Sequence, residues 1–309
     1  MQITRRNFVA ASTLLTAARR LPAAEPNLRF GTTPHDRLAI ASYSLRTLLP
    51  SARRRSAGNV PADAMDIKDF PSFVVKRFNL RNVELLGQHL PSTDAAYLEE
   101  YRRILSHAGV QVVNIPTSVG ASLYDPDPAR RATAVENSKK WIENANALGC
   151  PSVRIHIQRA GNTAPDAGRT AESLAEVARY GESKGVVVNL ENDDLFSEDA
   201  FFIASVIDQV NSRWLRALPD FCNSMLKGDE KFNYDAMAAM FRRAYNISHL
   251  KDAEVDRGKV FRIDLARTFE IAKTSGYLGY FSVEFEGEGD AVEGTAKLVE
   301  AALRYLAPG

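Results

Sequence analysis

The stretch VVVNLENDD (residues 186–194) combines an apolar run with acidic residues at its end. The three valines are β-branched and suit a buried strand, and little in the sequence indicates a turn before Glu191. An ionised carboxylate is rarely buried unless it is paired or binds a metal. The stretch therefore predicts a strand that delivers Glu191 either to a salt bridge or to a functional site.

The same apolar pattern recurs along the chain and alternates with segments of helical periodicity. We expect strands over residues 38–45, 82–87, 111–117, 152–158, 186–192, 215–221, 247–252 and 280–287. We expect helices over residues 66–78, 94–109, 129–149, 170–185, 199–210, 234–245, 264–276 and 290–306. Apolar strands separated by helices predict a parallel sheet that is covered on its outer face.

Eight such units over about 250 residues match a single (βα)₈ TIM barrel, which we assign to residues 36–309. The alternative is an open doubly wound sheet, which often has a glycine-rich fingerprint after its first strand. No GxGxxG sequence occurs in the chain, and this favours the barrel.

The first 24 residues predict a leader that precedes the barrel. They contain the pair Arg5–Arg6, a short apolar stretch at 9–18 and small residues near position 24. This layout is typical of a twin-arginine signal peptide and predicts a periplasmic or extracellular protein. A basic amphipathic helix is the alternative. Ten apolar residues are too few to span a bilayer, so we expect no stable membrane anchor.

The charge of the chain gives no reason to expect a nucleic-acid partner. The net charge is +1, and without the four arginines of the leader it would be −3, whereas phosphate-backbone binders carry an excess of basic residues. The aperiodic segment 46–65 carries Arg53, Arg54 and Arg55. We interpret it as a solvated basic loop, with a binding loop as the alternative.

The last four predicted strands each carry one potential metal ligand toward their carboxyl ends: Glu191, Asp220, His249 and Glu284. Their separations of 29, 29 and 35 residues each correspond to about one βα unit. The active sites of TIM barrels lie at this end of the strands. Three carboxylates and one imidazole suit a divalent metal, and we expect Mn²⁺, with Mg²⁺, Co²⁺ or Zn²⁺ as alternatives. Salt bridges or helix caps are the alternative for any single residue.

The ordered set VNLEN, LPDF, SHLKD and SVEFEG resembles the strand ends of the xylose isomerase-like superfamily, the family of sugar phosphate isomerases and epimerases. SYSLR (42–46) and VELLG (83–87) are similar to its first two strands. The resemblance covers nearly the whole chain after the leader. It implies a barrel whose metal is held by the Glu, Asp, His and Glu of strands five to eight.

The resemblance also implies proton transfer next to the carbonyl of a sugar or keto-sugar, through an enediolate. Glu191 and Glu284 would then be the catalytic bases on opposite faces of the substrate. We assign substrate binding to four further side chains, for each of which a purely structural role is the alternative: His156, which could also transfer a proton, Lys251, Glu84 and Asn223.

Two positions depart from the ketose epimerases of this superfamily, which carry a His three residues beyond the strand-six Asp and an Arg six residues beyond the strand-seven His. This chain has Asn223 and Val255 there, and the pair His249-x-Lys251 resembles the branch that includes inosose dehydratases. We therefore expect an isomerase or epimerase, with a lyase acting on oxidised sugars such as 3-keto-glycosides as the first alternative.

Two other classes of protein are further alternatives. An endonuclease IV-like nuclease needs a three-metal cluster rich in histidine, and the chain contains only five histidines. A non-catalytic binding protein on the same barrel would be expected to have lost a ligand or a base, and all four are present. The expected partner is a small-molecule sugar or keto-sugar, and a homo-oligomer is left open.

Overall fold

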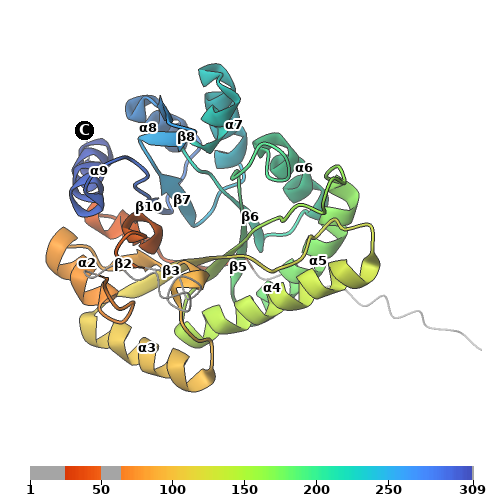
Figure 1. The fold of residues 1–309 in the computed structure, drawn as a ribbon, viewed down its shortest axis with the longest axis horizontal. Helices are drawn as coiled ribbons and strands as arrows, with labels where there is room; N and C mark the ends of the chain where they lie inside the picture. The colour runs from red at the N-terminus through yellow and green to blue at the C-terminus, as the bar shows by residue number, and fades with distance from the viewer. Residues whose placement is uncertain (1–24, 50–63, 308–309) are drawn as a thin grey trace, which may run out of the picture.

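The computed structural model describes residues 25–49 and 64–307, which form a TIM barrel (Figure 1). The predicted leader (1–24) and the three arginines of the predicted basic loop, at positions 53–55, lie outside these residues, so the leader and the export that it implies stay predictions. In the part of the chain that is described, no helix is both long enough and apolar enough to cross a membrane.

Eight parallel strands form the wall of the barrel and confirm the predicted fold. In space they follow the order β6-β5-β4-β3-β2-β1-β10-β7. The barrel closes between β6 and β7, where the His249 amide donates to the Pro219 carbonyl at 2.9 Å and the Phe221 amide donates to the His249 carbonyl at 3.2 Å. The strands are β1 (Leu38–Ala41), β2 (Asn82–Glu84), β3 (Gln111–Thr117), β4 (Ser152–Ile155), β5 (Val187–Glu191), β6 (Leu215–Leu218), β7 (Ile247–Leu250) and β10 (Tyr280–Val283).

Helices surround the strands as an outer ring (Figure 1). Several of them begin at an aspartate whose side chain accepts a hydrogen bond from the first turn, as Asp199 does from the Phe201 and Phe202 amides, which satisfies otherwise unpaired donors. The α-helices are α2 (Phe70–Phe78), α3 (Ala95–Ala108), α4 (Pro128–Leu148), α5 (Ala167–Lys184), α6 (Ala200–Val210), α7 (Glu230–Phe241), α8 (Leu265–Thr274) and α9 (Ala291–Leu306). The short 3₁₀ helices are η1 (His35–Arg37), η2 (Ser42–Leu45), η3 (Gly87–His89) and η4 (Asn223–Lys227).

The structure differs in detail from the pattern predicted by the sequence. β2, β4, β6 and β10 end three or four residues earlier than expected. The first strand ends at Ala41, and the polar residues that follow it form η2 instead of extending the strand to residue 45. An antiparallel hairpin of β8 (Ala253–Asp256) and β9 (Lys259–Arg262) interrupts the alternation between β7 and α8. Its two turn residues, Arg257 and Gly258, have φ of 49° and 77°, the conformation that a two-residue hairpin turn requires.

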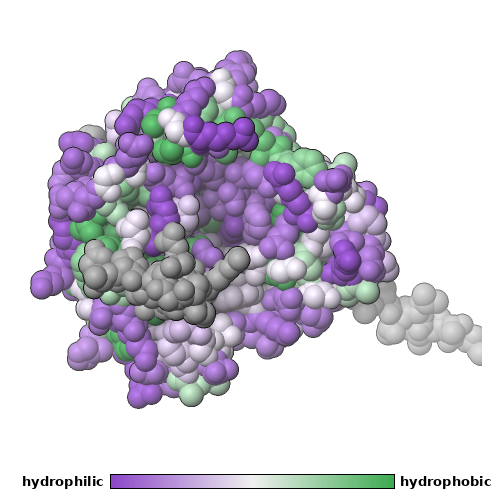
Figure 2. Space-filling model, in the orientation of Figure 1, coloured by the Kyte–Doolittle hydropathy of each residue, from purple (hydrophilic) through white to green (hydrophobic). Residues whose placement is uncertain are grey.

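The barrel interior contains a network of polar side chains around Glu84. Asn114, on β3, donates a 2.7 Å hydrogen bond to Glu84 on β2, and Ser282, on β10, donates one of 2.6 Å to the other oxygen of that carboxylate. Apolar side chains instead fill the space between the strands and the helices. Figure 2 shows a hollow lined with hydrophilic residues in the middle of the face it presents.

Gly181 permits the close packing of α5 against β5, the strand that carries Glu191. A Cβ atom at this position would lie 2.5 Å from the Val186 carbonyl oxygen and 3.2 Å from a methyl group of Val188. We predict that Gly181→Ala lowers the free energy of unfolding by about 1–3 kcal/mol through overpacking, measured by urea denaturation.

Gly168→Ala, in the first turn of the same helix, is the matched control, because the added Cβ meets only an Asp166 oxygen at 3.4 Å. This variant should unfold at the same urea concentration as the wild type or be more stable by up to about 1 kcal/mol. Equal stability of the two variants would contradict the packing argument.

Candidate metal centre

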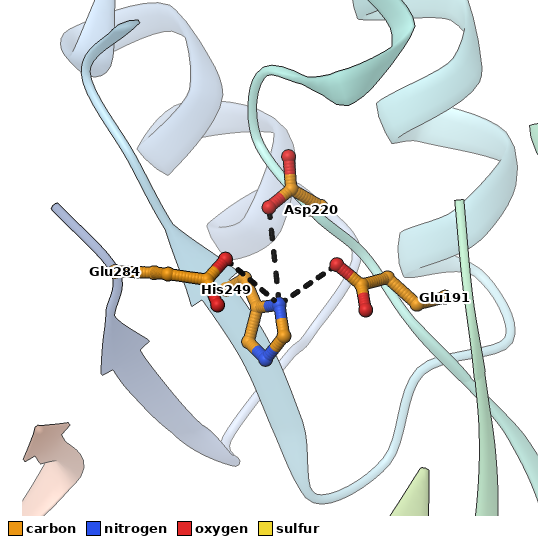
Figure 3. Close-up of side chains that lie close together, drawn as sticks. All are labelled: Glu191, Asp220, His249 and Glu284. Atoms are coloured by element: carbon orange, nitrogen blue, oxygen red, sulfur yellow. Dashed lines mark hydrogen bonds and ion pairs between the residues drawn. The ribbon is translucent and has the colours of Figure 1, made fainter. Parts of the chain in front are cut away.

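Glu191, Asp220, His249 and Glu284 converge on one buried point, and one donor atom from each lies within 4.8 Å of the donors of the others (Figure 3). From His249 Nδ1 the distances are 2.8 Å to Glu191 Oε1, 3.4 Å to Glu284 Oε2 and 3.8 Å to Asp220 Oδ2. The two glutamates approach the imidazole from opposite sides, with the aspartate between them (Figure 3). The structure therefore brings together the four side chains that the sequence placed on consecutive strands.

The register of the sheet explains why these side chains meet. Glu191 on β5 is level with Leu218 on β6, and Asp220 follows two residues later, which returns it to the same face of the strand. Asp220 is in turn level with His249. His249 is level with Ser282 on β10, and Glu284 again lies two residues further on. The period of two along each strand thus aims all four into the barrel mouth.

Burial raises the pKa of two of the three carboxyl groups. The pKa of Asp220 rises to about 6 and that of Glu284 to about 7, in both cases chiefly because the side chain is removed from water. Burial alone would lower the pKa of His249, but the surrounding carboxylates, Glu191 first, outweigh it and hold that pKa well above its usual value. The centre therefore holds protons that a divalent cation would displace on binding.

The donor set fits a divalent cation. Oδ2 of Asp220 is buried and accepts no hydrogen bond from the described residues. Its charged neighbours are Lys251 Nζ at 3.3 Å and His249 Nδ1 at 3.8 Å, so it faces the centre as a candidate ligand. Three carboxylate oxygens and one imidazole nitrogen are hard to borderline donors of the kind that Mn²⁺, Mg²⁺, Co²⁺ and Zn²⁺ accept. A dication would also offset the mutual repulsion of the three carboxylates.

Glu84 lies behind His249 and not in the mouth of the barrel, where a substrate could reach it. Its side chain is 1% exposed, and Oε2 lies 3.0 Å from His249 Nε2. Asn114 and Ser282 bond its two oxygens. Both oxygens are thus engaged by the protein, and the predicted substrate contact of Glu84 stays a prediction. A carboxylate at Nε2 instead favours a proton there and leaves Nδ1 facing the candidate ligands, which is the usual arrangement around a metal-binding histidine.

Lys251 and Asn223 border the centre on its other side. The Lys251 ammonium is buried and lies 3.3 Å from Asp220 Oδ2 and 3.2 Å from Glu284 Oε2. It also lies 3.3 Å from Glu254 on β8 and 3.0 Å from Glu286 beyond β10. One cation therefore compensates four carboxylates.

Asn223 connects the two halves of this arrangement. Its amide donates to Glu191 Oε1 at 3.3 Å and its carbonyl accepts from Lys251 Nζ at 3.0 Å. The side chain is 5% exposed. Its polar atoms are therefore used in holding a candidate ligand and a cation in place.

A second polar cluster lies next to the centre. Of its members, only His156 was predicted from the sequence as a site residue. Arg154 on β4 contacts Glu191 Oε2 at 3.0 Å, Asp193 at 2.7 Å and Glu198 at 3.2 Å. His156 Nδ1 lies 2.6 Å from Glu198 Oε2. The signal for Arg154 was a charged residue inside the apolar run SVRIHIQ (152–158), whereas Glu198 occurs in a loop with no periodicity that would have placed it.

A cavity of about 200 Å³ opens beside this second cluster. Arg154, His156 and Asp193 line it together with residues that follow β2 or lie at the end of β3: Leu86, Gln88, Pro116, Thr117 and Ser118. Arg154 connects the cavity to the candidate metal centre through its contact with Glu191. A molecule bound at the centre could therefore extend into the half of the mouth that is formed by β2 to β5.

Residues 74–308 match the family model described as xylose isomerase-like TIM barrel. The chain belongs to this family. Solved structures of similar fold include D-psicose 3-epimerase from Clostridium cellulolyticum H10, with 18% sequence identity, a TM-score of 0.62, and coverage of 78% of this chain and 92% of that one. No curated protein matches the sequence.

Two other solved structures share the fold at comparable similarity. A xylose isomerase-like TIM barrel protein from Mycobacterium smegmatis, in complex with magnesium, has 17% identity and a TM-score of 0.64, with coverage of 89% of this chain and 98% of that one. The 3-keto-D-glucoside 4-epimerase from E. coli has 16% identity and a TM-score of 0.60, with coverage of 79% and 96%. At these identities the likeness establishes the fold.

We predict that Lys251→Met strongly destabilises the metal-free protein, because the variant leaves Asp220, Glu284, Glu254 and Glu286 without the cation that they share. Removing one partner of a buried ion pair typically costs about 3–5 kcal/mol, and urea denaturation at pH 7 in the presence of a chelator would measure the loss. The loss should shrink at pH 5, because the pKa values of Glu284 and Asp220 are raised to about 7 and about 6, so both carboxyl groups become mostly protonated and neutral between pH 7 and pH 5.

Lys231→Met is the matched control, since Lys231 pairs with Asp235 on the exposed surface of α7. Exposed pairs contribute about 0–1 kcal/mol. A Lys251→Met variant that unfolded at the same urea concentration as this control would show that the cation is dispensable.

Proposed function

We propose that the protein is a divalent-metal-dependent isomerase or epimerase that moves a proton next to the carbonyl of a sugar or keto-sugar. The observation that carries this proposal is the placement of two buried glutamates, Glu191 and Glu284, on opposite sides of a single ligand-competent imidazole (Figure 3). Proton transfer at carbon needs a base on a defined face of the substrate, and two such bases serve both faces.

The four residues of the candidate centre would hold the ion: Glu191, Asp220, His249 and Glu284. Mn²⁺ is our first choice because the donors are mostly carboxylate oxygens with one nitrogen, and Mg²⁺, Co²⁺ or Zn²⁺ remain compatible with them. When bound, the ion would act as a Lewis acid that polarises the substrate carbonyl and acidifies the neighbouring C–H bond.

The side chains of the protein would carry out the proton transfer and hold the ligands in position. One of the two glutamates removes the proton from carbon, and the other, or a water beside it, returns a proton on the second face. Glu84 fixes the orientation of His249 from behind, and Lys251 holds Asp220 and Glu284 in place. Burial, which raises the pKa of Glu284 to about 7, brings this carboxyl group near the value at which a general base works best at neutral pH.

A lyase that eliminates a substituent from an oxidised sugar is the second candidate. The same proton removal drives elimination when a leaving group sits next to the carbanion. Asn223 and Val255 stand where ketose epimerases of this family would have His and Arg, and His156 with its cavity lies on the side of the centre away from Lys251. One protein of similar fold is a 3-keto-D-glucoside 4-epimerase, which supports oxidised glycosides as substrates to test.

Deuterium exchange would test the reaction class without knowledge of the product. We expect metal-loaded protein in D₂O to incorporate deuterium next to the carbonyl of at least one member of a panel of free ketoses and 3-keto-glycosides. Glu284→Gln and Glu191→Gln should each slow this exchange at least about 100-fold, as followed by NMR. Glu172→Gln, on the exposed face of α5, is the control and should exchange at the wild-type rate.

Calorimetry on the same variants separates loss of the base from loss of the metal. A Gln variant that still binds Mn²⁺ but does not exchange has lost the base. Wild-type protein that binds metal and exchanges no substrate of the panel would remove the support for both the isomerase and the lyase.

We predict that Mn²⁺ affinity rises as pH increases from 5.5 to 7.5. Protons compete with metal for the same atoms, and the pKa values of Asp220 and Glu284, raised to about 6 and about 7, place their deprotonation inside this window. Isothermal titration in two buffers of different ionisation enthalpy would measure both affinity and proton release. An affinity that did not change with pH, or binding that survived Asp220→Asn unchanged, would contradict the assigned ligands.

A further inference from the structure

His156 and Glu198 form a histidine–carboxylate pair that the four-residue centre does not use. His156 Nδ1 lies 2.6 Å from Glu198 Oε2, and the other oxygen of that carboxylate accepts from the Ile157 amide at 2.7 Å. Glu198 is fully buried, so two contacts and its surroundings fix its position. A carboxylate held in this way determines both the orientation of the imidazole and the location of its proton.

The geometry of this pair does not suit a second metal. His156, Asp193 and Glu198 have donor atoms within 4.8 Å of one another. However, the Arg154 guanidinium already lies between the two carboxylates, at 2.7 Å from Asp193 and 3.2 Å from Glu198. A permanent cation therefore occupies the place that a metal ion would need.

The second nitrogen of the imidazole is available to a ligand. His156 Nδ1 is buried, while 27% of the side chain is exposed, so the exposed edge is the one that carries Nε2. Nε2 has no hydrogen-bond partner among the described residues, and His156 lines the cavity of about 200 Å³. The side chain thus presents one N–H group to the half of the mouth that adjoins Glu191 through Arg154.

We propose that His156, positioned by Glu198, is the general acid of this site and protonates an oxygen that leaves the substrate. The substrate class that this arrangement fits is an oxidised glycoside, bound with its carbonyl at the candidate metal centre and its O-linked substituent in the cavity. The inference rests on the proposed function and selects its elimination branch.

The elimination of the O-linked substituent can be written with the residues of this site alone. A carboxylate of the centre takes the proton from the carbon next to the carbonyl, and the electron pair of that C–H bond forms a C=C bond to the neighbouring carbon. The C–O bond to the substituent breaks, and its electron pair goes to the leaving oxygen. His156 Nε2–H gives that oxygen its proton. The carboxyl group then releases its proton to solvent and the neutral imidazole takes one from solvent, so both groups are regenerated and the net change is loss of the alcohol.

The charges around the imidazole support an acid and not a base. Burial lowers the pKa of His156, but its hydrogen bonds to Asp193 and Glu198 outweigh this and raise it to about 9, against the opposing charge of Arg154. The pKa of Glu198 is raised to about 7, chiefly by burial. Between these values the pair consists of a His156 imidazolium and a Glu198 carboxylate. The imidazole therefore carries the proton of a general acid at neutral pH and loses it as pH rises through about 9.

The test compares two leaving groups in His156→Gln. The probes are methyl and 4-nitrophenyl 3-keto-β-D-glucoside with Mn²⁺-loaded protein, and the readouts are deuterium exchange at C2 and release of the alcohol. Methanol needs a proton to leave, so its release should slow at least about 100-fold. Nitrophenolate leaves without one, so its release should slow less than about 10-fold, and C2 exchange should stay within about 3-fold of the wild type.

Two further variants complete the design. His107→Gln, at an exposed position on α3, should behave as the wild type with both substrates. Glu198→Gln should shift the alkaline limb of kcat/KM for the methyl glycoside below pH 9, because the imidazolium loses its carboxylate partner. A merely structural role would lower the rates without moving this limb.

The outcomes distinguish this inference from the proposed function. Equal slowing of both leaving groups in His156→Gln would overturn the acid role while leaving the proton-transfer centre intact. C2 exchange by the wild type with no release of either alcohol would do the same. An absence of exchange by the wild type would overturn the proposed function itself, and the acid role with it.

Discussion

The crowding of like charges at the carboxyl ends of β5, β6, β7 and β10 is the constraint on which the rest of the structure depends. Three carboxylates lie within 4.8 Å of one another around one imidazole, and all four side chains are buried. Carboxylates at such distances repel strongly, and removing each from water adds a further cost. A fold that places them there must supply compensating positive charge from its own side chains, from bound protons or from a metal ion.

The chain supplies compensation from two sides. Lys251 contacts Asp220 and Glu284 from the side of β7 and β10, and Arg154 contacts Glu191 from the side of β4. Each of the three candidate carboxylate ligands therefore has a permanent cation beside it before any metal binds. This arrangement keeps the carboxylates in place for a metal, and it explains why the centre can be part of a well-packed barrel and not a disordered acidic loop.

The periodicity of the strands made the candidate metal centre predictable. Loops have no such periodicity, so the residues on loops that support the centre could not be placed from the sequence. Glu191, Asp220, His249 and Glu284 follow apolar strands at spacings of about one βα unit, so their convergence could be inferred before any coordinates. The role of Glu84 could not be inferred in this way, because the pattern of a strand does not say which of two polar neighbours a carboxylate will bond. Glu198 and Glu254 lie outside the predicted strands, and the β8–β9 hairpin that carries Glu254 interrupts the expected alternation. Glu286 lies inside the predicted strand 280–287 but beyond the observed end of β10 at Val283. Their contacts depend on loop conformation, which no period encodes.

The partners of the two cations also constrain the substrate. Arg154 contacts three carboxylates, and Lys251 contacts four carboxylates and an amide oxygen. In the part of the mouth that the structure describes, neither cation is left without an anionic partner. A phosphorylated sugar needs uncommitted arginine or lysine donors for its phosphate, and here it would meet an excess of carboxylates. Among the described residues, the candidate centre itself therefore favours contact with neutral hydroxyl groups, which can donate hydrogen bonds to its carboxylates, over direct contact with a phosphate group.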